Sequence, residues 1–197
     1  ELNAGHQLLS LPHAKVSRFR ISAADGAEAI SALPEQGERQ FGLGLRRLHL
    51  DQMLLERAKR AGVSVNEGVK VKSLVRESRG WRLDMHCGGE RFSVRAKLLV
   101  GADGRNSWVA RQLGVASEPP NRSAAVGFQI QLQDVPGLHG SVEIHQFAGG
   151  YAGLVRVDAD RVNLCFTVNR SLLGRSVSFE NLRERFLRRN PVLHELL

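Results

Sequence analysis

The stretch "LLVGADGRNSWVARQLGV", residues 98–115, decides how this chain is expected to fold. The run "KLLV" (97–100) that leads into it is largely apolar, which suits a parallel strand buried on both faces. The run ends at Gly-Ala-Asp-Gly (101–104), and Asn106 or Ser107 is placed to cap a helix continuing through Gln112. The stretch therefore predicts a central parallel strand, a tight turn at its carboxyl end and a helix.

A turn of this kind is suited to a ligand, because open α/β sheets bind ligands outside the carboxyl ends of their strands. Gly101 and Gly104 allow close backbone approach and positive φ. Asp103 is expected to accept hydrogen bonds from backbone N–H groups or a sugar hydroxyl, since a carboxylate and a phosphate repel each other. Free N–H groups at the helix start, together with Arg105, would favour a pyrophosphate. The alternative is an ordinary strand–turn–helix corner.

Composition indicates a globular chain of 197 residues, with 42% hydrophobic and 24% charged residues. No apolar run approaches the length of a membrane span, and the first residues do not resemble a signal peptide. The chain does not start with methionine, which suggests a cut or processed start. Cys87 and Cys165 are too few for a disulfide framework, and both are expected to be buried in strands. We therefore expect a cytoplasmic protein.

The net charge of +8 raises the question of nucleic-acid binding. The arginines are scattered, with only pairs such as Arg46-Arg47, and no aromatic residues are interleaved for base stacking. A basic nucleic-acid-binding domain is therefore the weakest alternative, and no specific nucleic-acid partner is expected. The seven histidines lack metal-ligand spacing with Cys, Asp or Glu, so no metal is expected either.

Periodicity predicts the remaining elements. A hairpin is expected at 16–31 around a two-residue Asp25-Gly26 turn, a short strand at 41–45, and a helix from His49 to a Gly62 cap. A meander of three strands follows at 69–76, 81–87 and 91–96. Residues 124–168 predict an antiparallel sheet, and "SFENLRERFLRRN" predicts one helix capped by Ser178. The covered face of that sheet is expected to carry Val126, Phe128, Ile130, Leu164 and Phe166.

The stretch 98–114 resembles the Asp-Gly motif of the p-hydroxybenzoate hydroxylase-like flavoproteins, which include FAD-dependent aromatic hydroxylases and geranylgeranyl reductases. Upstream, "LRRLHLDQMLLERAKRAGV" is similar to the Arg-x-x-Leu-Asp-x-x-Leu helix start of these proteins, through Arg47, Leu50, Asp51 and Leu54. "VKVKSLV" resembles their strand beside the adenine, and "GGYAGLVRVDADRVNLCFTV" their antiparallel substrate-domain sheet. The resemblance covers residues 38–190.

This resemblance implies an α/β protein with a partial Rossmann-like FAD-binding domain, in which a parallel core strand accompanies a β-meander. That domain would span 1–118, with an inserted hairpin near 12–35, and an antiparallel-sheet substrate domain would span 119–197. It implies an FAD-dependent oxidoreductase, either a monooxygenase or an alkene reductase, that uses NAD(P)H on a small apolar or aromatic substrate. The implied FAD contacts are Arg47, Val71, Gly101, Asp103, Gly104 and Arg105. Tyr151 either lines a substrate pocket or packs the sheet, and no catalytic residue is assigned.

Two motifs of the family are absent: the Gly-x-Gly-x-x-Gly turn that holds the pyrophosphate, and the later Gly-Asp-Ala motif that holds the ribityl chain and flavin. "GLGLRR" (42–47) has Arg47 where the third glycine would stand. The chain is therefore expected to be an internal fragment that binds FAD weakly or not at all, with the missing parts of the same protein as its partners. The alternative from another class is a non-catalytic remnant or interaction domain.

Overall fold

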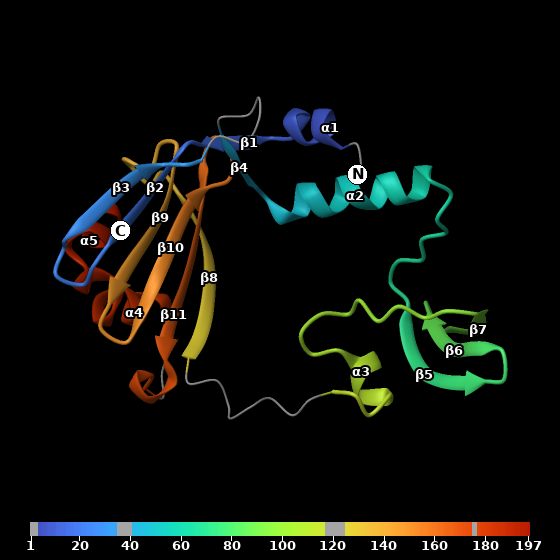
Figure 1. The fold of residues 1–197 in the computed structure, drawn as a ribbon. Helices are drawn as coiled ribbons and strands as arrows, with labels where there is room; N and C mark the ends of the chain where they lie inside the picture. The colour runs from blue at the N-terminus through green and yellow to red at the C-terminus, as the bar shows by residue number, and fades with distance from the viewer. Residues whose placement is uncertain (1–3, 35–40, 117–124, 175–176) are drawn as a thin grey trace. The chain divides into compact units, whose positions relative to one another are not determined.

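The computed structural model describes residues 4–34, 41–116, 125–174 and 177–197 (Figure 1). The chain forms two compact units, one from residues 1–57 with 121–197 and one from residues 58–120. Helices separate runs of three or four consecutive strands along the chain, and both mixed and antiparallel sheets occur. The structure thereby confirms a mixed α/β fold.

The first unit is built on a six-stranded sheet in the order β3-β2-β9-β10-β11-β8. Its strands are β2 (Arg18–Ser22), β3 (Glu28–Ala32), β8 (Ala125–Gln133), β9 (Ser141–Phe147), β10 (Gly150–Arg156) and β11 (Arg161–Asn169). All neighbours are antiparallel except β2 and β9, which run parallel. The hairpin expected near residues 12–35 therefore lies in the same sheet as the strands of the C-terminal part of the chain.

The β2–β3 hairpin is as predicted, but its turn is not. Positive φ occurs at Gly26 (89°) and not at Asp25. The closing bond runs from Ala23 N to Ala27 O (2.7 Å), and Asp25 Oδ1 accepts from Ala27 N (3.0 Å). Because the loop is longer than two residues, only one of its positions needs the left-handed conformation.

The core lies on one face of this sheet. Along β11, the side chains of Val162, Leu164, Phe166 and Val168 are at most 1% exposed. Phe166 pairs with Phe128 of β8, and their rings stack at 5.0 Å. Leu182, Phe186, Leu187 and Leu193, from the C-terminal helices, complete the cluster. The predicted sheet and its covered face are confirmed, with Val126, Phe128 and Ile130 partly buried at the edge.

The C-terminal helix is capped by Ser178 as predicted, but it is not continuous. Its segments are α4 (Phe179–Arg185), the 3₁₀ turn η2 (Leu187–Arg189) and α5 (Pro191–Leu196). The break falls at Phe186, where φ is −127°. Phe186 and Leu187 are adjacent in sequence and both buried in the core. In a straight helix the side chains of adjacent residues point about 100° apart. The break at Phe186 lets both of these side chains pack in the core.

A small antiparallel ladder precedes the first long helix. It joins β1 (His13–Val16) to β4 (Gly42–Leu45), beside α1 (Gly5–Ser10). A Cβ at Gly44 would lie 1.9 Å from the carbonyl oxygen of Arg156 in β10, so only glycine allows this close approach. β4 leads into α2 (Arg47–Arg60), which confirms the predicted helix and its cap at Gly62 (φ 87°). The Gly44 contact thus fixes where α2 begins against the large sheet.

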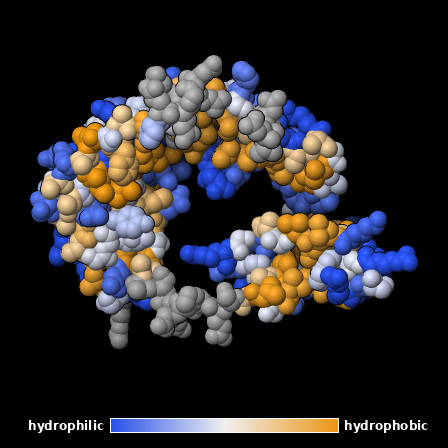
Figure 2. Space-filling model, in the orientation of Figure 1, coloured by the Kyte–Doolittle hydropathy of each residue, from blue (hydrophilic) through white to orange (hydrophobic). Residues whose placement is uncertain are grey.

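The second unit contains the predicted meander of β5 (Lys70–Glu77), β6 (Gly80–Cys87) and β7 (Glu90–Ala96), followed by α3 (Trp108–Gln112). No residue of the described range 58–116 is buried. Figure 2, drawn in the orientation of Figure 1, shows apolar residues at the surface of these elements. Phe92 and Val94 of β7, for example, are 37% and 43% exposed.

The predicted central parallel strand at 97–100 is wrong for this structure. These residues form no strand, and Leu98 and Val100 are 77% and 75% exposed. The apolar run predicted the strand from composition, but a parallel strand exists only through hydrogen bonds to neighbours on the sheet. No strand of the described residues pairs with this run.

Replacing Phe166 by alanine is expected to destabilise the first unit by about 3–5 kcal/mol, because it empties a fully buried aromatic site. Cys165→Ala, one residue away on the exposed face, is the matched control and is expected to change stability by less than about 0.5 kcal/mol. Urea denaturation followed by circular dichroism measures both. If the two variants lost the same amount of stability, the assignment of Phe166 to the buried face and of Cys165 to the exposed face would be wrong.

Candidate functional site

The Asp103 turn gathers four of the predicted site residues: Gly101, Asp103, Gly104 and Arg105. Asp103 Oδ2 accepts from the backbone N–H groups of Trp108 (2.7 Å) and Val109 (3.1 Å), and Oδ1 accepts from Ser107 Oγ. The Ser107 hydrogen bond, with the Val109 and Trp108 N–H groups, outweighs desolvation and lowers the pKa of Asp103. The prediction that this carboxylate accepts backbone N–H groups and holds the turn is confirmed.

The two glycines of the turn serve different purposes. Gly104 has φ 82°, and a Cβ there would meet nothing within 4 Å. A Cβ at Gly101 would lie 2.9 Å from Val109 Cγ1 of α3. Gly104 is therefore required by backbone conformation and borders open space, whereas Gly101 is required by packing against the helix.

The helix start is not the free anion site that the sequence suggested. The N–H groups of Trp108 and Val109 donate to Asp103, and that of Ala110 donates to Ser107 Oγ (2.9 Å). The expected capping by Ser107 is thereby confirmed, but capping and anion binding compete for the same donors. The exposed Arg105 is the cationic group that the turn presents.

Val71 lies in β5 of the same unit, half-buried opposite Met85 of β6. Arg47 and Tyr151 belong to the first unit. Arg47 is the first residue of α2, with its side chain 80% exposed and paired with Asp51 at 3.0 Å. An ion pair this exposed contributes little to stability, so Arg47 is available to a ligand at small cost.

Arg47 also lines a pocket of about 110 Å³ between the start of α2 and the sheet. Beside it lie Leu45, Arg46, Leu48, Gln129, Gln131, Val157 and Asn163. Among the described residues, Arg46 Nε is buried without a hydrogen-bond partner. Two arginines and three side-chain amides give this pocket the donors that an anionic group needs.

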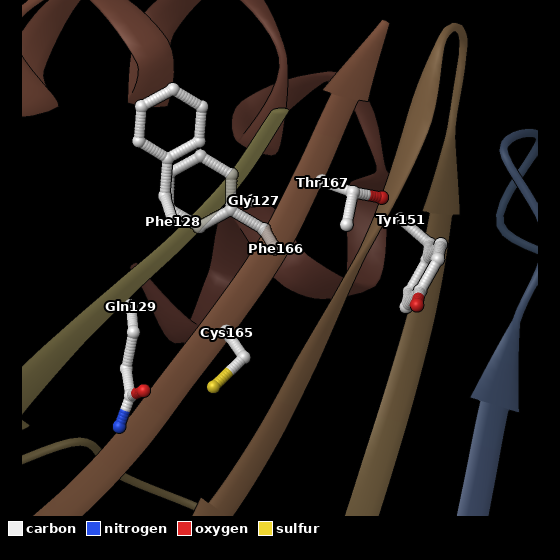
Figure 3. Close-up of a pocket in the computed structure, with 7 residues that line it drawn as sticks. All are labelled: Gly127, Phe128, Gln129, Tyr151, Cys165, Phe166 and Thr167. Carbon is white, nitrogen blue, oxygen red and sulfur yellow. The ribbon is translucent and has the colours of Figure 1, made fainter. Parts of the chain in front are cut away.

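Tyr151 lines a second pocket, of about 320 Å³, on the exposed face of the sheet (Figure 3). Its other lining residues are Gly127, Phe128, Gln129, Cys165, Phe166 and Thr167. Tyr151, Thr167 and Gly127 stand in one row across β10, β11 and β8. Tyr151 is 49% exposed, so its ring lines the pocket instead of filling the core.

The expectation of buried cysteines is wrong: Cys165 is exposed and Cys87 is half-buried. Cys165 lies between Leu164 and Phe166, so strand alternation places it on the opposite face from both. The same alternation places Gln129 and Asn163 there, which sequence reasoning did not assign. Gln129 Nε2 donates to Asn163 Oδ1 (3.0 Å), and Gln129 lines both pockets. Both have odd numbers, whereas the core residues of the two strands have even numbers, and this alternation is the signal from which the sequence could have assigned them.

Two glycines inside strands leave this face open. A Cβ at Gly127 would meet nothing within 4 Å, and one at Gly153 would make only ordinary contacts at 3.8 Å. A glycine inside a strand loses entropy on folding and packs nothing, and it often marks close approach of a ligand. The face therefore offers a shallow, largely apolar floor beside a cationic pocket.

The described residues include no group of three or more His, Cys, Asp or Glu side chains that could hold a metal ion. None of the helices in these parts of the chain is long and apolar enough to cross a membrane. The arrangement therefore offers binding groups: arginines, amides, an aromatic ring and open glycine positions.

The profile of a family described as "FAD binding domain" matches residues 14–151, more than half of the chain. The chain belongs to this FAD-binding family. The matched range includes every residue proposed above as a cofactor or substrate contact, from Arg47 to Tyr151. The resemblance to the p-hydroxybenzoate hydroxylase-like and geranylgeranyl reductase flavoproteins is thereby confirmed.

Among curated proteins, the chain is 29% identical over 146 residues to digeranylgeranylglycerophospholipid reductase 1 of Methanothermobacter thermautotrophicus. This match covers 70% of the chain and 36% of the relative. The reductase of Methanosarcina mazei is 32% identical, with 58% of the chain and 29% of the relative covered. The chain thus spans about a third of the length of these curated relatives.

Solved structures share the fold. The myxobacterial chondrochloren halogenase CndH, an FAD-dependent halogenase, superposes with a TM-score of 0.84 at 16% identity, covering 100% of this chain and 47% of its own. The halogenase PltM, solved with phloroglucinol and FAD, gives a TM-score of 0.77 at 15% identity, covering 94% of this chain and 41% of its own. At such identities the likeness establishes the fold alone.

The folded pKa of Asp103 is depressed, so the stability it gives the turn is present above its unfolded value and is lost as pH falls through the folded value. In a carboxyl ¹³C NMR titration, the pKa of Asp103 is expected to lie below the ordinary value of an aspartate side chain. Ser107→Ala is expected to raise that midpoint, because the Ser107 hydrogen bond is the largest cause of the shift.

Ser93→Ala is the matched control, since Ser93 donates to Asp84 and not to Asp103. It is expected to raise the midpoint of Asp84 and to leave Asp103 unchanged. If Ser107→Ala left the Asp103 midpoint in place, the account of the turn would be incorrect.

Proposed function

We propose that this chain is part of an FAD-dependent oxidoreductase that uses NAD(P)H to act on a small apolar or aromatic substrate. The observation that carries the proposal is the FAD-binding family match, because it runs through the Asp103 turn and includes both Arg47 and Tyr151. Redox chemistry by a flavin needs no protein nucleophile, which fits a site made of binding groups.

The residues present fit FAD in part. Gly104 borders open space and Arg105 is exposed, which suits close approach of a nucleotide and contact with its phosphates. Asp103, whose oxygens are engaged within the turn, would shape that approach without touching a phosphate. Arg47 would supply a second cation, and Val71 an apolar contact. When bound, FAD supplies hydride chemistry, and these side chains bind and orient it.

The exposed sheet face is the proposed substrate side. Its glycine floor and the Tyr151 ring suit an apolar or aromatic group, and the Arg46–Arg47 pocket suits an anionic group. The curated relatives are named as reductases of digeranylgeranylglycerophospholipid, which favours alkene reduction. A monooxygenase is the second candidate.

We further propose that the protein acts in the cytoplasm.

We also propose that other parts of the same protein cover the second unit. The support for this cover is that no residue of the described range 58–116 is buried, and that Leu98 and Val100 are largely exposed. An apolar surface of this extent is normally covered in the folded protein. Such a cover would also give residues 97–100 the strand neighbours that the described residues do not provide.

The chain of residues 1–197 alone is expected to bind FAD with about millimolar affinity or weaker. Exposed arginine contacts contribute about 0–1 kcal/mol each, whereas association costs roughly 4–15 kcal/mol. Titration followed by quenching of flavin fluorescence measures this. A micromolar complex would show that the binding energy resides in these residues after all.

Joining the chain to a Gly-x-Gly-x-x-Gly unit is expected to give yellow protein, in which matched variants test the contacts. Arg47→Ala is expected to weaken FAD binding and Asp51→Ala is not, although both break the same ion pair. Gly104→Ala is expected to weaken FAD binding more than Gly68→Ala, because only Gly104 lies in the proposed FAD contact. The two variants are matched, since both glycines have positive φ and open surroundings. Equal effects within each pair would contradict the assigned contacts.

Gly127→Ala is expected to raise the KM for an isoprenoid alkene in the flavin-loaded protein, because a methyl group fills the floor of the Tyr151 pocket. Its stability is expected to stay the same or rise by up to about 1 kcal/mol, since the position has space and no positive φ. Gly174→Ala, also without positive φ and away from this pocket, is the control. A KM unchanged in Gly127→Ala would place the substrate elsewhere.

A further inference from the structure

The meander β5–β6–β7 of the second unit (Figure 1) has two faces of opposite chemistry. Side chains that are direct partners across the strands share a face, and successive residues of a strand alternate between the faces. One face carries two rows of three apolar side chains: Val71, Met85 and Phe92, and Leu74, Leu83 and Val94. The cover proposed above for this unit would lie on this apolar face, because covering it removes apolar surface from water.

The other face, which we call the basic face, carries a row of basic residues near the β6–β7 turn. Lys70, His86 and Arg91 are direct partners across β5, β6 and β7. Lys72 adjoins this row at the point in β5 where the register with β6 shifts. Lys70, Lys72 and Arg91 are exposed, and none of the four residues has a part in the function proposed above.

The cations of this row have no acidic partners within the parts of the chain that the structure describes. No ion pair or hydrogen bond joins the side chains of Lys70, Lys72 or Arg91 to another residue there. Desolvation lowers the pKa of His86, and the nearby charges of Arg91 and Lys72 lower it further. Cations that gather without acidic partners repel one another, so the row adds nothing to the stability of the meander.

Two acidic residues of the basic face lie outside this row and are already engaged. Asp84 accepts hydrogen bonds from serine hydroxyls of β5 and β7, and Glu77 pairs with Arg95 at 3.0 Å. Glu90, next to the row in β7, stands opposite Cys87 and therefore belongs to the apolar face. The end of the basic face near the β6–β7 turn is thus left with a net positive charge.

The row is broad and open, which suits a surface better than a single small ligand. Adjacent strands lie about 4.8 Å apart, so the row spans about 10 Å. The turn beside it is Gly88-Gly89, and a Cβ at either glycine would meet nothing within 4 Å. Small ligands are usually enclosed in a concave pocket, whereas these cations stand exposed on a sheet face.

We propose that Lys70, Lys72, His86 and Arg91 dock the protein on the anionic headgroups of a phospholipid membrane surface. Headgroup phosphates spread over a plane match a flat array of cations, and each lysine or arginine near such a surface strengthens binding about fivefold. Nucleic acid is the other large polyanion. It fits less well, because the Trp81 and Phe92 rings, which could stack on bases, lie on the apolar face.

Sedimentation of the 197-residue chain with phospholipid vesicles tests the proposal without any flavin, so its outcome is separate from that of the FAD titration. Vesicles that contain phosphatidylglycerol are expected to bind more protein than vesicles of phosphatidylcholine alone, and added salt is expected to reduce the difference by screening the charges. The phosphatidylcholine vesicles measure how much the uncovered apolar face adheres to lipid. Equal binding to the two kinds of vesicle, or no binding to either, would overturn the proposal.

The double variant Lys72→Gln/Arg91→Gln is expected to bind phosphatidylglycerol vesicles about 25-fold more weakly, because it removes two cations of the row. Its circular dichroism is expected to be unchanged, since both side chains are exposed. The matched control is Arg170→Gln/Arg189→Gln, which removes two exposed cations of the first unit and is expected to bind like the unchanged chain.

Two results with these variants would overturn the proposal. Equal losses in the two double variants would attribute vesicle binding to the net charge and not to the row. Tighter binding to a DNA duplex than to the vesicles, weakened by Lys72→Gln/Arg91→Gln and not by the control, would assign the row to nucleic acid.

Discussion

Strand alternation in the six-stranded sheet is the constraint on which the first unit depends. Phe128 and Phe166 stack on one face, and the C-terminal helices bury the row of β11 residues beside them. A slip of one residue would move every one of these side chains to the other face, so the apolar set pins the register. The register in turn places Tyr151, Cys165 and Gln129 together on the opposite face. The candidate substrate pocket is thus a consequence of the core.

Close backbone contacts then position the charged groups around that face. Gly44 lets β4 pass against the Arg156 carbonyl of β10, and α2 starts three residues later with Arg47. A larger residue at position 44 would push the helix start away from the sheet and separate Arg47 from Gln129 and Asn163. The cationic pocket and the apolar pocket are neighbours because a single glycine permits the approach.

The second unit differs from the first in that its geometry depends on local hydrogen bonds and not on a buried core. Its Asp103 turn satisfies its own polar groups, with Ser107, Trp108 and Val109 all donating to one carboxylate. Its apolar residues, however, are not buried within the described part of the unit. Polar groups that are satisfied locally keep their geometry without a core, which is why this turn holds its shape although no residue of the described range 58–116 is buried. The FAD-binding family match runs through the same residues.

The sequence by itself determined the features that depend on near neighbours. Ser107 and Ser178 cap their helices, Gly62 ends α2, and the alternation of β8 and β11 predicts the covered face, because each rests on residues a few positions apart. Only the tertiary structure decided the parallel β2–β9 pair, the break at Phe186 and the absence of a strand at 97–100. Each of these depends on a partner far along the chain, and local periodicity carries no information about which partner is present. The buried hydrogen bonds of Ser22 with His145 and Asn190 have the same origin, since residues more than a hundred positions apart become neighbours only when the sheet and α5 close over them.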